Sequence, residues 1–150
     1  MLPQKLYASG KVYQFLIASA FIILLLVGVS CKSQKQFSSE DQILFGRGGG
    51  FAGQETTYKL QGDGSLMVRK SIQGGFTLAK EGLDRKEIRS IFKGAHRLNW
   101  SEIDLNNPGN TYRFLSFNKD GKTYKLTWGG NATAPPKFQY LYDRLYTLAR

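Results

Sequence analysis

Cysteine and histidine are nearly absent from the sequence, because its 150 residues include only Cys31 and His96. One cysteine excludes an internal disulfide. Cys31 also ends an apolar segment, so we expect no Cys–His pair in the folded part of the chain. The sequence has no cluster of His and Cys ligands, and we therefore expect no metal site.

Acidic residues are the second scarcity. The chain has 11 Asp and Glu residues against 21 Lys and Arg residues, a formal net charge of +10. Turns and a helix start account for several of the acids: Asp63, Asp120, Asp84 and Glu87. Glu102 and Asp104 are close in sequence, whereas paired catalytic carboxylates usually come from separate elements that face a cleft. We therefore expect no catalytic activity, and Glu102, Asp104 and His96 form the alternative catalytic set.

Charge is also missing from residues 12–31, most of which are apolar. Lys5 and Lys11 precede this segment, as in the basic start of a secretory signal. At about 1.5 Å per helical residue the segment is also long enough to span a bilayer. We expect residues 1–30 to be a signal peptide or membrane anchor, and residues 31–42 to be a flexible tether.

The residues Gly28-Val29-Ser30-Cys31 at the end of this segment resemble the lipobox of bacterial lipoproteins, although Gly28 replaces the usual Leu, Val or Ile. The resemblance implies that Cys31 receives diacylglycerol and becomes the new N-terminus. The alternative is an uncleaved signal-anchor helix. Both alternatives place the folded part in the bacterial cell envelope, held on a membrane and facing the periplasm or the exterior. They leave the particular membrane and the oligomeric state open.

Residues 43–150 are expected to form a single α+β domain. Asp-Gly turns join the β-prone runs 55–60 and 65–70, and 112–117 and 122–128, which predicts two hairpins. Short strands are expected at residues 43–45 and 76–78. Helical periodicity from Asp84 to Leu98, and again after Pro135, predicts two helices. The expected architecture is an antiparallel sheet of about four to five strands covered by two helices.

Aromatic residues are plentiful, with eight Tyr, ten Phe and two Trp. Tyr124, Leu126 and Trp128 alternate with polar residues, which indicates a strand with one buried face. A stacking surface for bases or sugars is the alternative use of such aromatics. We favour the core of a small domain.

The stretch FGRGGGFAGQ (residues 45–54) holds five glycines. Gly48, Gly50 and Gly53 match the dinucleotide-binding pattern G-x-G-x-x-G, which functions between a strand and a helix. Here a strand pattern follows the glycines. Gln54 and Glu55 also occupy the positions where a phosphate-binding loop needs Lys and Ser or Thr. We therefore expect no nucleotide cofactor.

Glycines also allow positive φ and close approach of a neighbouring chain. Phe51 lies at the tip of this loop, where it either anchors a partner or folds back onto the core. The candidate partner-binding residues are Arg47, Gly49, Gly50, Phe51 and Gln54.

The letters GGGFAG (residues 48–53) resemble emfourin, a small inhibitor associated with protealysin, which is a thermolysin-type zinc protease. The coarse order of elements is similar too. The resemblance implies a compact α+β inhibitor that occupies a protease cleft without chemistry of its own.

The sequence thus favours a membrane-anchored, extracytoplasmic protein-binding module without catalytic activity, in its sharpest form a protease inhibitor. One alternative is an enzyme acting on envelope polysaccharide. Another is a structural lipoprotein whose basic surface rests on anionic lipid. A secreted domain rarely meets nucleic acid, so none is expected as a partner.

Overall fold

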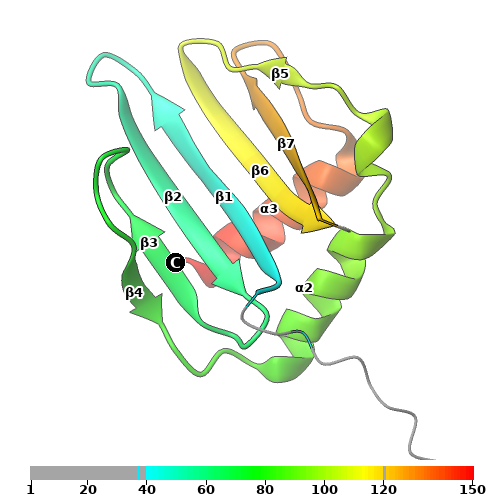
Figure 1. Cartoon of the computed structure of the whole chain (residues 1–150). Helices are drawn as coiled ribbons and strands as arrows, with labels where there is room; N and C mark the ends of the chain where they lie inside the picture. Colours follow the sequence, from blue (N-terminus) through cyan, green and yellow to red (C-terminus); the bar gives the residue numbers. More distant parts are fainter. Residues whose placement is uncertain (1–36, 38–39, 120) are drawn as a thin grey trace, which may run out of the picture. The chain divides into compact units, whose positions relative to one another are not determined.

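The computed structural model describes residue 37 and residues 40–119 and 121–150 of the chain (Figure 1). The expected signal or anchor of residues 1–30 and the lipidation site Cys31 lie outside these residues. Across the described ranges, no helix is both long and apolar enough to cross a membrane.

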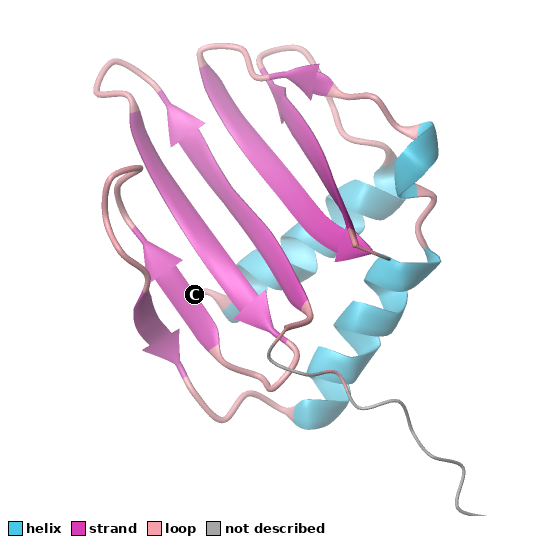
Figure 2. Cartoon of the chain, in the orientation of Figure 1, coloured by secondary structure: helices cyan, strands magenta, loops and turns pink. Residues whose placement is uncertain are grey.

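The domain is a seven-stranded sheet with two α-helices on one face (Figures 1 and 2). The strands are β1 (Gln42–Gly49), β2 (Gln54–Gln61), β3 (Leu66–Arg69), β4 (Thr77–Lys80), β5 (Asn106–Asn107), β6 (Thr111–Lys119) and β7 (Lys122–Gly129). Their spatial order is β4-β3-β2-β1-β6-β7-β5, and every neighbouring pair is antiparallel except β5 with β7. The helices are α2 (Arg85–Arg97) and α3 (Pro136–Leu148), with a short 3₁₀ helix at Trp100–Glu102. The predicted α+β class is confirmed, and the predicted strand number is wrong.

One strand, β5, has no counterpart among the expected strands, and it forms where local signals point to a turn. Asn106–Asn107, in a segment with turn composition, pairs in parallel with Thr127 and Trp128. Strand β1 also continues past Phe45 to Gly49, because both of its edges remain paired, with β2 on one side and β6 on the other.

Glycine in a central strand usually marks the close approach of another group. A Cβ at Gly48 would lie 2.6 Å from Tyr112 Oη and 2.7 Å from Tyr112 Cζ. A Cβ at Gly46 would lie 2.9 Å from Phe114 Cζ. These two glycines therefore make room for aromatic rings on the sheet face that is turned away from the helices.

The β2–β3 hairpin and the two helix starts have the expected local causes. The Asp63 carboxylate accepts hydrogen bonds from Ser65 N at 2.9 Å and Ser65 Oγ at 2.8 Å, which closes the β2–β3 turn. At the start of α2, Asp84 accepts from Lys86 N at 3.0 Å. Pro136 begins α3, as its missing N–H and fixed φ favour.

The core lies between the sheet and the two helices. Each helix buries one face, formed by Ile88, Ile91, Phe92 and Ala95 in α2 and by Phe138, Leu141, Tyr142 and Leu145 in α3. Phe37, within the expected tether, is only 6% exposed, and its ring stacks on Phe92 with the centroids 5.1 Å apart. The folded domain therefore includes Phe37 in addition to the expected residues 43–150.

Candidate functional site

The helix-facing side of the sheet changes character along its strands. Two cross-strand rows in β2, β1, β6 and β7 are apolar and pack in the core: Leu60, Ile43, Phe117 and Tyr124, then Tyr58, Phe45, Leu115 and Leu126. The next row on the same side is Thr56, Arg47, Arg113 and Trp128. Side chains two positions apart in a strand share a face, so the two arginines continue the core-facing pattern where hydrophobic residues would be expected.

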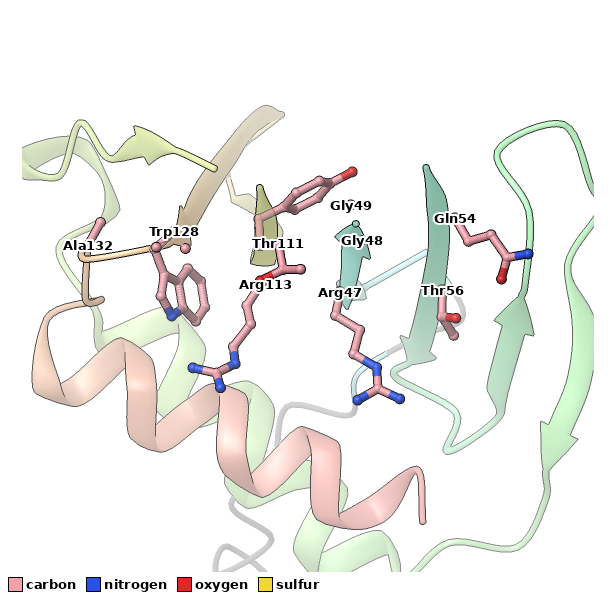
Figure 3. Close-up of a pocket in the computed structure, with 12 residues that line it drawn as sticks. Arg47, Gly48, Gly49, Gln54, Thr56, Thr111, Arg113, Trp128 and Ala132 are labelled. Atoms are coloured by element: carbon pink, nitrogen blue, oxygen red, sulfur yellow. The ribbon is translucent and has the colours of Figure 1, made fainter. Parts of the chain in front are cut away.

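Arg47 and Arg113 are directly opposite each other on β1 and β6. Both side chains are exposed and extend from their strands toward α3 (Figure 3). Like charges in opposing positions destabilise a sheet. Within the described ranges neither arginine forms an ion pair, whereas Arg69 pairs with Glu55 at 3.7 Å and Arg144 with Glu87 at 3.8 Å. The pair is an unneutralised positive charge.

The two arginines line an open cleft of about 550 Å³ (Figure 3). The other lining residues are Gly48, Gly49, Gln54, Thr56, Thr111, Tyr112, Trp128, Gly129, Gly130 and Ala132. We call this the arginine cleft. Gln54, Thr56 and Thr111 place an amide and two hydroxyls in its lining, which are neutral donors and acceptors. A ligand can approach the backbone closely at Gly130, where a Cβ would meet Gly109 Cα at 3.9 Å.

Trp128 forms an apolar wall of the arginine cleft. It is 1% exposed, and its ring meets Tyr142 edge to face with centroids 5.2 Å apart. Its buried Nε1 donates no hydrogen bond to a described residue. The other tryptophan, Trp100, donates from Nε1 to Ala95 O at 2.8 Å. Of the two tryptophans, Trp128 is therefore the one whose indole N–H can serve as a probe of the arginine cleft.

A smaller cleft of about 250 Å³ also contacts both arginines, on the side of α3. Its other lining residues are Gln139, Tyr142, Asp143, Tyr146 and Arg150. Two guanidinium groups lie over the Tyr146 ring, with Arg47 Cζ at 5.7 Å and Arg150 Cζ at 5.2 Å from its centroid. Asp143 is the acid of this cleft, and it accepts from Gln139 Nε2 at 2.8 Å. Three arginines against one aspartate leave the region cationic.

The hydroxyl of Tyr142 ties α3 to the sheet beneath the arginines. It donates to Gly46 O at 3.1 Å. Burial raises the pKa of Tyr142 to about 12, although the nearby positive charges of Arg113 and Arg47 act in the opposite direction. The phenol is therefore neutral at physiological pH and acts as a hydrogen-bond donor.

The β1–β2 loop borders the arginine cleft. Gly49, Gly50 and Gly53 have φ of 91°, 78° and 57°, which favours glycine at these positions. Gly50 N donates to Asn110 O at 2.8 Å, which attaches the loop to the chain before β6. Phe51 at the tip is fully exposed, so the alternative in which it folds back onto the core is wrong. Strand β2 follows the glycines, as expected, and a dinucleotide-binding turn would need a helix there.

The structure brings the candidate partner-binding residues together. Arg47, Gly49 and Gln54 line the arginine cleft, and Gly50 and Phe51 form the adjoining turn. Sequence reasoning missed Arg113, Thr111 and the cleft-lining position of Trp128. The sequence does contain a signal for Arg113, because it lies two and four positions before the core residues Leu115 and Phe117 and therefore shares their face of β6.

Within the residues that the structure describes, the clefts of about 550, 380, 350 and 250 Å³ do not bring His96, Glu102 and Asp104 together. His96 packs against the rings of Phe37 and Phe117, with centroids 5.6 Å and 4.9 Å away. Glu102 lines a separate cleft of about 380 Å³ whose lining includes neither His96 nor Asp104. In the described part of the chain, no group of three His, Cys, Asp or Glu side chains is placed to hold a metal ion.

The arrangement at the end of β1 is suited to binding, because it combines a concave cationic surface, an apolar wall and an exposed aromatic. Comparisons with protein-family models and with curated proteins find no match for the chain. A function is therefore inferred from its own residues.

Proposed function

We propose that this protein is a non-catalytic, membrane-anchored binding module of the bacterial envelope. Its partner is a protein, and the contact surface consists of the β1–β2 loop and the arginine cleft. The N-terminal segment of residues 1–30, or a lipid on Cys31, holds the module at the membrane.

One observation carries the proposal: Phe51 is fully exposed on a glycine turn beside an open cleft. Aromatic residues and arginine are enriched at protein interfaces. Burying a Phe side chain stabilises a protein or a complex by about 1.5–3 kcal/mol relative to leaving it in water. At the exposed loop tip, Phe51 gains none of this stabilisation. Contact with a partner would bury Phe51 and give this unfavourable exposure a function.

The test compares Phe51→Ala with Ile72→Ala in the full-length chain, extracted from envelopes with its bound proteins. Ile72 is a matched control, because it is 61% exposed on a different loop. We expect Phe51→Ala to reduce recovery of the partner at least about tenfold, as loss of an anchor residue does, and Ile72→Ala to leave it unchanged. Equal recovery with both variants would refute the proposed contact surface.

The resemblance to emfourin supports a sharper form of the proposal, in which the partner is a thermolysin-type zinc protease and binding blocks its active site. The experiment measures hydrolysis of a peptide substrate by such a protease while the full-length chain is added. Inhibition that Phe51→Ala weakens is the expected result. Unchanged hydrolysis at a saturating concentration of the full-length chain would refute the inhibitor role. It would not affect the broader proposal of a protein-binding module.

A further inference from the structure

We propose that Arg47 and Arg113 form an oxyanion site that holds a carboxylate of an acidic segment in the partner protein. The inference rests on the proposed function in taking the ligand from a protein. It goes beyond it in naming the chemical group that the arginine cleft recognises.

The sheet register carries the first step. It places the two guanidinium groups on neighbouring strands, at opposing positions and on one face. Both side chains extend toward α3 (Figure 3), and both line the same two clefts. An anion between them would receive charge-assisted hydrogen bonds from both sides and remove their mutual repulsion.

The surrounding charges keep the site available to an outside anion. Among the described residues that line the two clefts, Asp143 is the one acid, and its carboxylate already accepts a hydrogen bond from Gln139 on its own helix. Arg150 adds a third cation to the smaller cleft. The stacking of Arg47 over the Tyr146 ring orients its guanidinium without neutralising it.

The shape of the region favours a peptide carboxylate over a small free anion. The arginines contact two clefts, of about 550 Å³ and 250 Å³, and a single phosphate would occupy a small part of this space. Gln54, Thr56 and Thr111 line the larger cleft and offer the neutral donors and acceptors that peptide groups need.

The two tryptophans allow a direct test. The full-length chain, labelled with ¹⁵N in detergent micelles, has one indole N–H signal from Trp128 in the cleft wall and one from Trp100 in the core. The probe is a capped Ala-Asp-Glu-Ala peptide, and the neutral isostere Ala-Asn-Gln-Ala is its control. We expect the acidic peptide to shift the Trp128 indole signal in a saturable manner and to leave the Trp100 indole signal unchanged. The acidic peptide should bind at least about tenfold more tightly than the amide peptide.

Arg113→Gln should lower the affinity for the acidic peptide at least about tenfold, because the substitution removes one charge-assisted hydrogen-bond donor. Arg97→Gln is the matched control, since it makes the same charge change at an exposed position of α2 and should leave the affinity unchanged. Equal affinity of the two peptides, or an unchanged affinity in Arg113→Gln, would overturn the oxyanion site. Inorganic phosphate binding as tightly as the acidic peptide would overturn the assignment to a carboxylate.

Failure of this inference can be told apart from failure of the proposed function. If Phe51→Ala abolishes partner recovery while the acidic peptide does not shift Trp128, the binding surface stands and the oxyanion site is wrong. If the peptide binds as expected while Phe51→Ala recovers the partner normally, the oxyanion site stands and the contact surface assigned to the loop is wrong.

Discussion

Replacing Arg113 with Gln should make the folded domain more stable at low salt. Arg113 and Arg47 oppose each other on β6 and β1, and neither has an ion-pair partner within the described ranges. Two unit charges about 5–10 Å apart repel by about 0.4–0.8 kcal/mol in a water-like dielectric. Removal of one charge should therefore raise the free energy of unfolding by about 0.5 kcal/mol, or the melting temperature by about 2 °C for a domain of this size.

The assay is urea unfolding of the full-length chain and its variants, followed by circular dichroism at about 10 mM and about 1 M salt. The Debye length is about 30 Å at the lower and about 3 Å at the higher concentration, so the gain should disappear at high salt. Arg144→Gln is a control of opposite sign, because it removes the ion pair with Glu87 and should cost up to about 1 kcal/mol at low salt. Arg47→Gln should be nearly neutral, since it relieves the repulsion and loses the contact with the Tyr146 ring.

Stability gained by removing a residue is the expected sign of a position that serves binding at a cost to the fold. A loss of more than about 1 kcal/mol in Arg113→Gln, persisting at about 1 M salt, would refute this reasoning. It would show that the guanidinium stabilises the sheet through contacts that do not depend on screened charge.

Four further substitutions, one of them a matched control, test how the fold is held together. Gly48→Ala should lower the free energy of unfolding, measured with urea, by about 1–3 kcal/mol, because the added Cβ would lie 2.6 Å from Tyr112 Oη. Gly75→Ala is the control: the added Cβ would lie in open space, so the free energy of unfolding should change by less than about 0.5 kcal/mol. Gly94→Ala, inside α2 with no atom near the added Cβ, should raise it by about 0.5–1 kcal/mol. Burial raises the pKa of Tyr142 from 10.0 to about 12, so the folded domain keeps a phenolic proton that the unfolded chain loses near pH 10. The free energy of unfolding should fall by about 2–3 kcal/mol more between about pH 10 and 12 than it does in Tyr142→Phe, and equal slopes would contradict the assigned burial.

Elements with local causes could be predicted from the sequence. The Asp63-Gly64 turn, the cap at Asp84 and the proline start of α3 each depend on residues close together in the chain, and the structure has them at the expected positions. The pairing of β1 with β6 could not be predicted in this way. It joins strands from opposite parts of the folded chain, and a strand's own alternation does not select its neighbour.

The candidate site was predicted in part for the same reason. Arg47 and Gln54 lie in the glycine-rich stretch, whose local composition predicts a binding loop. Arg113 belongs to the site only through the register between β1 and β6, which places it opposite Arg47. The sequence predicts that Trp128 lies on the buried face of its strand. That it also lines the arginine cleft depends on where the helix-facing side of the sheet becomes polar, which the sequence alone does not show.

The central claim is that the β1–β2 loop and the arginine cleft together receive a protein partner. A photo-crosslinking phenylalanine derivative at position 51 of the full-length chain, which keeps the aromatic ring and is activated in intact envelopes, tests it most directly. We expect one main crosslinked protein, a yield at least about tenfold lower when Arg113→Gln is added, and no such product from position 72. The same products from positions 51 and 72, or a yield from position 51 that Arg113→Gln leaves unchanged, would contradict it.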